Sequence, residues 1–79
     1  MATFNCTHAS LDDLVDWMTT NVGPLFTKSW DSAIGSDWMF RVVDYDVLGD
    51  DNEVIAVNII WEITIDDPKR ATLAMIRWA

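Results

Sequence analysis

Apolar residues recur along this chain with two different periods, and each period predicts one kind of element. After Ser10 they fall three and four positions apart, as on one face of a helix. The members of this stripe are Leu11, Leu14, Val15, Met18 and Val22. Ser10 stands where an N-cap is expected, with Asp13 three residues later, and Gly23-Pro24 ends the pattern. We therefore predict one amphipathic helix over residues 11–22.

Most of the remaining chain is predicted to be extended. Residues 2–7 indicate a short strand, residues 37–46 are rich in aromatic and β-branched side chains, and residues 71–78 form a further apolar run. The clearest alternation covers residues 54–65, where the odd-numbered positions from 55 onward are apolar. Residues 25–36 show no clear period and are predicted to be an ordered loop.

The pairing of these strands follows from matching apolar residues across each turn. A hairpin centred near Asp50 places Phe40 opposite Ile59. A four-residue turn over residues 66–69 places Ile59 opposite Ile76. The pattern therefore predicts the order βαβββ, an α+β fold in which one helix packs on an antiparallel sheet of three to four strands.

The sheet face turned away from the helix is predicted to be more apolar than a solvated surface. In this register Met39, Ile60 and Met75 form one row on that face, and Leu73 lies beyond them. An apolar patch of this kind marks an interaction surface. We expect the loop over residues 25–36, a partner, or a second copy of the chain in a homodimer to cover it.

Composition narrows the class of protein. The 79 residues are 51% apolar and 23% charged, with 13 acidic and 5 basic residues and a net charge of −8. This length fits one domain over residues 1–79, and the apolar content is too high for a disordered chain. So few Lys and Arg residues disfavour direct binding to nucleic acid. No apolar run is long enough to span a membrane.

The single cysteine bears on the compartment. Cys6 has no second cysteine with which to form an internal disulfide, whereas small secreted domains normally rely on such bonds. The first residues show neither the basic nor the apolar region of a secretory signal. We therefore expect a cytoplasmic protein.

Candidate catalytic and metal-binding groups are few. Cys6 and His8 share one side of the first predicted strand, and such a pair can act as nucleophile and base, but no third group orients the imidazole. The segment from Asp44 opens like a calcium-binding EF-hand loop, yet Leu48 and Ile55 stand where that loop requires oxygen ligands. One Cys and one His cannot supply four zinc ligands. We expect a protein that is not an enzyme and uses no metal or cofactor.

The strongest functional signal is the distribution of charge. No Lys or Arg occurs between Val42 and Pro68, a stretch that holds Asp44, Asp46, Asp50, Asp51, Glu53, Glu62, Asp66 and Asp67. A further acidic group lies on the polar arc of the predicted helix and consists of Asp12, Asp13 and Asp16. Surplus charge keeps a small protein soluble. Because the mutual repulsion also costs stability, a functional role is the alternative.

One such role is mimicry of nucleic acid. Alternate residues of a strand lie about 6.6 Å apart on one face, comparable to neighbouring phosphates, and Asp44 and Asp46 have this spacing. Aromatic side chains nearby, namely Tyr45, Trp38 and Trp17, would anchor a partner that the charge attracts. The predicted partner-binding residues are Asp44, Tyr45, Asp46, Asp50, Asp51, Glu53, Asp12, Asp13, Asp16 and Trp17.

In size, acidity, its single cysteine and its compact α+β pattern, the chain resembles small phage-encoded inhibitors, namely anti-CRISPR proteins and acidic DNA mimics such as the uracil-DNA glycosylase inhibitors. The resemblance covers the composition of the whole chain and no individual motif. It implies a non-catalytic inhibitor that acts in the host cytoplasm on the basic surface of a nuclease, CRISPR effector or DNA-repair enzyme. The alternative is a homo-oligomeric structural or assembly protein that associates through Met39, Ile60, Leu73 and Met75.

Overall fold

The computed structural model describes residues 2–7, 9–49 and 53–78, which form two helices and one five-stranded antiparallel sheet. In chain order the elements are β1 (Ala2–Cys6), α1 (Leu11–Asn21), β2 (Leu25–Ser29), β3 (Ser32–Gly35), β4 (Trp38–Gly49), β5 (Val54–Ile65) and α2 (Pro68–Trp78). The strand order in the sheet is β1-β5-β4-β3-β2. The predicted α+β class is confirmed, with one more helix and at least one more strand than expected.

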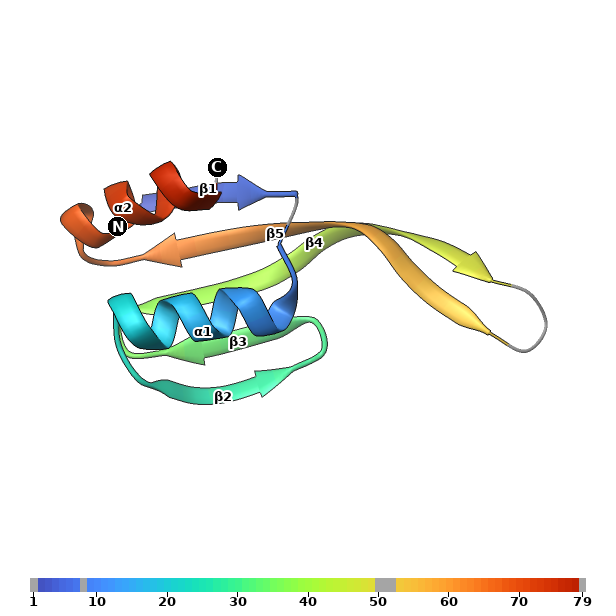
Figure 1. Ribbon diagram of the computed structural model, residues 1–79, viewed down its shortest axis with the longest axis horizontal. Coiled ribbons are helices and arrows are strands. Elements are labelled where there is room, and N and C mark those ends of the chain that lie inside the picture. Colours follow the sequence, from blue (N-terminus) through green and yellow to red (C-terminus); the bar gives the residue numbers. More distant parts are fainter. Residues whose placement is uncertain (1, 8, 50–52, 79) are drawn as a thin grey trace.

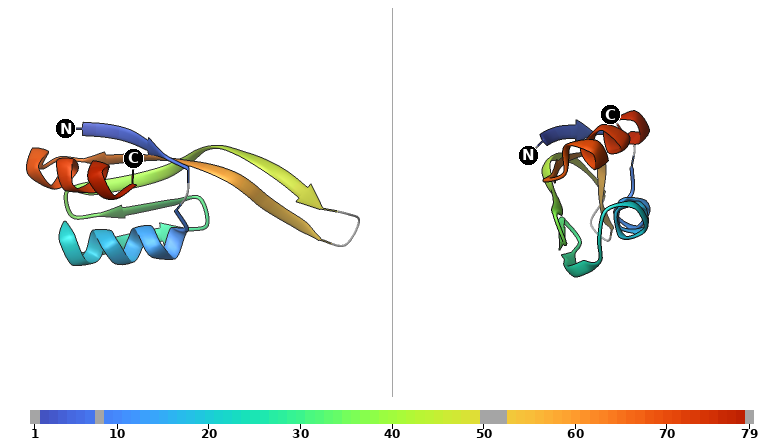
Figure 2. Two further views of the ribbon diagram at one scale, coloured as in Figure 1. Left: turned by 45° about the horizontal axis from the view of Figure 1, so that its top comes forward. Right: turned by 90° about the vertical axis from the view of Figure 1, so that its left-hand side faces the viewer.

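Both helices lie against the same face of the sheet. Helix α1 packs on β2 and β3, and α2 packs on β1 and β5, so the two helices lie side by side over the sheet (Figure 1). The end-on view in Figure 2 shows the curved sheet on one side and both helices on the other. The opposite sheet face carries no helix in the described part of the chain.

Aromatic rings from the two central strands form the middle of the core. The Phe40 ring lies between two indoles, nearly parallel to Trp38 at 5.8 Å and perpendicular to Trp61 at 5.3 Å between ring centroids. The indole N–H of Trp61 donates to the carbonyl of Ala9 at 3.0 Å, and that of Trp38 donates to the carbonyl of Gly23 at 2.8 Å. Because these two carbonyls flank α1, the tryptophans hold both ends of the helix against the sheet.

Helix α1 begins at the predicted residue and ends one residue before the predicted end, with Val22 as its C-cap. The side chain of Ser10 accepts a hydrogen bond from the backbone N–H of Asp13 at 3.2 Å, which is the N-cap geometry. At the other end the N–H of Gly23 donates to the carbonyl of Met18 at 3.1 Å. Leu14 and Met18 are buried on the face turned to the sheet, while the three aspartates of this helix are exposed.

The predicted register of β4 and β5 is wrong by four residues. Phe40 pairs with Ile63 and not with Ile59, and Val42 pairs with Trp61. Since side chains alternate along a strand, a shift by an even number leaves every residue on its expected face. Trp38, Phe40, Trp61, Ile63 and Ile65 are therefore buried as expected despite the wrong partners. Ile55 and Val57, which were also expected on the core face, lie outside the buried core.

This register creates a projecting arm. Strand β3 pairs with β4 only over Trp38–Arg41, and β1 pairs with β5 only over Trp61–Ile65. The remainder of β4 and β5 continues as a two-stranded ribbon, which extends away from the body and gives the molecule its length of 45 Å against widths of 23 and 16 Å (Figure 1). We call residues 43–49 and 53–60 the arm; none of them belongs to the buried core.

Two segments were assigned the wrong structure from sequence. Residues 71–78, predicted as a strand, belong to α2, in which Ala71, Ala74 and Trp78 are buried at helical spacing. The carboxylate of Asp67 caps this helix by accepting the N–H of Lys69 at 2.9 Å. Residues 25–36, predicted as a loop, form the β2–β3 hairpin with Trp30 and Asp31 at its turn. No helix in the described ranges is long and apolar enough to cross a membrane.

Candidate protein-binding surface

The arm concentrates acidic side chains away from the basic ones. Asp44, Asp46 and Glu53 are exposed on it, while Asp50 and Asp51 lie outside the described residues. No Lys or Arg occurs anywhere between residues 43 and 60. The nearest base along β4 is Arg41, whose guanidinium forms an ion pair with Glu62 at 3.2 Å. The acidic side chains of the arm therefore have no Lys or Arg within the same segment of the chain.

The strand that carries these acids is irregular. The pairing of β4 with β5 shifts register on both sides of Asp44, and Asn58 on the opposite strand has a left-handed backbone with φ 53°. Asp46 accepts a hydrogen bond from the side-chain amide of Asn58 at 3.0 Å, and Asp44 accepts one from the N–H of Tyr45 at 2.9 Å. The even ladder of carboxylates expected from a regular strand is thus interrupted, and hydrogen bonds orient both side chains.

The arm also exposes apolar side chains, which the sequence analysis did not include in the site. Val47, Leu48, Val54 and Ile55 are each more than half exposed. Leu48 pairs with Ile55 on one side of the ribbon, and the next pair, Gly49 with Val54, lies on the other. Both sides of the ribbon therefore present apolar surface, as at protein-binding sites. The sequence does contain a signal for these exposed apolar residues. The apolar run of β5 begins at Val54, several residues before the part of the strand that pairs with β1.

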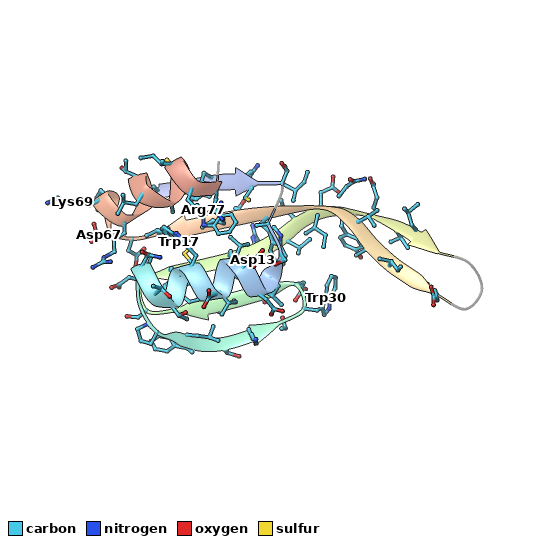
Figure 3. All side chains as sticks on the ribbon, in the orientation of Figure 1. Asp13, Trp17, Trp30, Asp67, Lys69 and Arg77 are labelled. Carbon is cyan, nitrogen blue, oxygen red and sulfur yellow. The ribbon has the colours of Figure 1, made fainter. Side chains whose placement is uncertain are left out.

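An aromatic pair lies where the arm leaves the body. The rings of Trp30 and Tyr45 meet edge to face, with centroids 5.8 Å apart and planes at 88°. Trp30 is at the β2–β3 turn, at the end of the hairpin nearer the arm (Figure 3). The carbonyl of Asp31 accepts the N–H of Val42 at 2.8 Å, which fixes this turn against β4. Trp30 was absent from the predicted site, although a tryptophan in a polar turn is itself a signal for exposure.

The three predicted aromatic anchors have different environments. Tyr45 is exposed beside the arm acids, as expected. Trp38 is buried in the core, so its prediction as an exposed anchor is wrong; its face of β4 points under the helices. Trp17 is half-buried on α1.

The acidic residues of α1 belong to a different surface from the arm. Asp13 and Asp16, with Trp17, line one side of a groove of about 310 Å³ between the helices, and Arg77 lines the other (Figure 3). The Arg77 guanidinium stacks over the Trp78 ring at 4.2 Å. Asp12 is exposed in the first turn of the helix. Because a base faces the groove, the charge of these aspartates is partly balanced, unlike that of the arm.

The four residues of the predicted oligomer interface do not share one face. Met39 lies on the open face of the sheet, paired with Ile34 and Thr64 and not with Ile60. Leu73 and Met75 are on α2, which packs on the opposite face. The predicted row of these residues is therefore wrong, because it assumed a strand at residues 71–78. The open face is largely polar and includes Thr3, Thr64, Arg41 and Glu62.

Only one member of the candidate catalytic pair, Cys6, belongs to the described residues. The Cys6 side chain is buried in the core, and His8 lies outside the described residues. Across the described ranges, no three His, Cys, Asp or Glu side chains gather in an arrangement able to hold a metal ion. The arrangement that does stand out is the arm with the aromatic pair at its root.

Searches against protein-family models, curated proteins and solved structures find no match for this chain. Function is therefore inferred from the chain's own residues.

Proposed function

We propose that this protein is a non-catalytic binding protein that uses its arm to occupy the basic, nucleic-acid-binding surface of another protein. The class of partner is a nuclease, a CRISPR effector or a DNA-repair enzyme. The observation that carries the proposal is the arm itself, a ribbon outside the core that has several carboxylates, no basic residue and exposed apolar side chains.

Two physical contributions support binding by such a ribbon. The carboxylates of the arm attract a positive surface over the distance of a Debye length and raise the association rate. The apolar side chains then contribute contact energy, at roughly 25 cal/mol for each Å² removed from water. Charge alone would leave binding weak at physiological salt, so the combination favours recognition of a protein surface over a purely solubilising role.

The experiment is displacement of nucleic acid. A fluorescent DNA duplex is bound to each member of a panel of nucleases, CRISPR effectors and DNA-repair glycosylases, and the protein is added while fluorescence anisotropy is measured. We expect displacement from at least one panel member, with affinity that falls as NaCl rises. The proposal is wrong if no member of the panel releases its duplex.

Two matched variants locate the surface. D44K/D46K reverses two arm acids, and D16K/D66K reverses two exposed acids of the body, so each changes the net charge from −8 to −4. The arm variant is expected to lose at least ten-fold in affinity, and the body variant to lose much less. Equal losses in both would show that total charge, and not the arm, determines binding.

The alternative of a homo-oligomer that associates through Met39, Ile60, Leu73 and Met75 has less support, because these residues lie on two opposite sides of the sheet. Sedimentation at micromolar concentration tests it, and a monomer would remove it.

A further inference from the structure

Trp30 differs from the other tryptophans of the chain. Three of the five, Trp38, Trp61 and Trp78, are buried in the core, and Trp17 is half-buried. Trp30 is 60% exposed, and the Tyr45 ring against which it packs is 43% exposed. Part of each ring is therefore already exposed to water in the free molecule. This exposed ring surface is available to a partner.

Acidic residues adjoin both members of this aromatic pair along the chain. Asp31 follows Trp30 in the turn, and Asp44 and Asp46 flank Tyr45 in β4. One oxygen of each carboxylate accepts a hydrogen bond: Asp31 from the Ser29 hydroxyl at 2.7 Å, Asp44 from the Tyr45 N–H, and Asp46 from the Asn58 amide. These hydrogen bonds orient the acids without neutralising them.

The nearby bases do not compensate this charge. Arg41 is paired with Glu62 on the open face of the sheet. Lys28, on β2, pairs in register with Ala33, a buried residue of the face under the helices. The turn and the strand that carry Trp30 and Tyr45 thus combine aromatic rings with acidic residues, and these are the groups that recognise a cation.

We propose that Trp30 and Tyr45 form a binding site for an arginine side chain supplied by the basic surface of the partner, an inference that rests on the proposed function. A guanidinium is planar and weakly hydrated, so it stacks on an aromatic ring while its N–H groups pair with a carboxylate. The ammonium group of lysine is compact and strongly hydrated, and it gains less from the ring. The site therefore discriminates arginine from lysine, which the arm charge by itself does not.

The position of the site suits this role. The hydrogen bond from Val42 to the carbonyl of Asp31 holds the β2–β3 turn against the strand that leads into the arm. The edge-to-face packing of the two rings links the turn directly to the arm. When a partner holds the arm in a groove, the rim of that groove lies next to the β2–β3 turn. The aromatic pair then contacts side chains at the edge of the partner's basic surface.

The test compares two capped peptides of equal length, nine arginines and nine lysines, by titration calorimetry with the full chain. We expect about a two- to five-fold preference for the arginine peptide, in line with an exposed cation–π contact. A change in tryptophan emission should accompany binding, because Trp30 is the most exposed indole. Equal affinity for the two peptides would overturn the proposal.

Variants assign the preference to the aromatic pair. In W30A the lysine peptide should bind as before while the arginine preference disappears, and W30F should retain part of it. F26A is the matched control, because Phe26 is 69% exposed on the neighbouring strand but has no acid beside it; this variant should keep the full preference. A preference that survives in W30A overturns the assignment. Failure of the DNA-displacement panel with an intact, Trp30-dependent preference would instead reject the proposed function.

Discussion

At the scale of single residues, the tryptophans have two separate tasks. Trp38 and Trp61 are buried, and their indole N–H groups hold the backbone at both ends of α1, so they determine where the helix lies. Trp30 makes no such bond to the backbone among the described residues and is exposed beside the arm. The same residue type therefore stabilises the core in one place and offers a contact surface in another.

The ring of Phe40 between the two core indoles allows a direct test. Phe40→Ala should lower the free energy of unfolding by about 3–5 kcal/mol, because it removes a fully buried ring and leaves a cavity. Phe26→Ala makes the same chemical change at an exposed position and should stay within about 0.5 kcal/mol. Urea unfolding followed by near-ultraviolet circular dichroism measures both. Similar losses in the two variants would contradict the arrangement of the core.

Single residues also show what the sequence reveals about the site. The acids of the arm were predicted from their lack of basic neighbours, which is a property of the sequence alone. The contact between Trp30 and Tyr45 was not, because it depends on the β2–β3 hairpin, which was predicted as a loop.

At the scale of elements, residues 66–78 explain the largest error. Asp66-Asp67-Pro68 was interpreted as a turn, but an acidic cap followed by proline at the first helical position is also a helix start. The apolar residues after it fit alternation and helical spacing about equally over so short a run. Packing of Ala71, Ala74 and Trp78 on the sheet then selects the helix, and this long-range contact is not visible in local periodicity.

The prediction of helix α1 was correct for the opposite reason. The cap at Ser10 and the apolar stripe of α1 are local signals that agree with each other. The hairpin register was wrong because several polar residues between Leu48 and Asn52 are equally suited to a turn. The irregular pairing around Asp44 adds shifts that no regular alternation predicts.

The arm should be separable from the rest of the fold. We expect a variant in which Asn-Gly replaces residues 46–57 to unfold cooperatively, because none of the described residues of that segment is buried and Asn-Gly closes a hairpin of two residues. Its near-ultraviolet spectrum should match that of the full chain, since the core indoles are retained. DNA displacement should be lost. Loss of the cooperative transition would show that the arm stabilises the body.

At the scale of the whole molecule, charge and shape are distributed unequally. Three of the five bases, Lys69, Arg70 and Arg77, lie on α2, whereas the arm has none. Arg70 is held locally by Asp67 at 3.6 Å and by the carbonyl of Asn21. The ion pairs among the described residues therefore involve few of the acids, and the net charge of −8 remains a source of repulsion in the compact state.

Because of this repulsion, we expect thermal stability and binding affinity to respond to salt in opposite directions. Raising NaCl from about 0.01 M to 0.15 M shortens the Debye length from about 30 Å to about 8 Å, which weakens repulsion between distant acids. The midpoint of thermal unfolding should therefore rise, while affinity for a basic partner falls. A midpoint that drops with salt would mean that attractive pairs dominate the surface. The D16K/D66K variant serves as the control, because its smaller net charge should reduce the rise.

The separation of the arm from the core has a consequence for how such a protein tolerates amino-acid substitutions. Substitutions at the distal ribbon leave the packed rings untouched, so its side chains can be replaced freely without loss of the scaffold. A variant library confined to that ribbon would then alter which target is recognised while every member keeps the same melting behaviour. The choice of target would then depend on the arm, and folding would depend on the core of the same short chain.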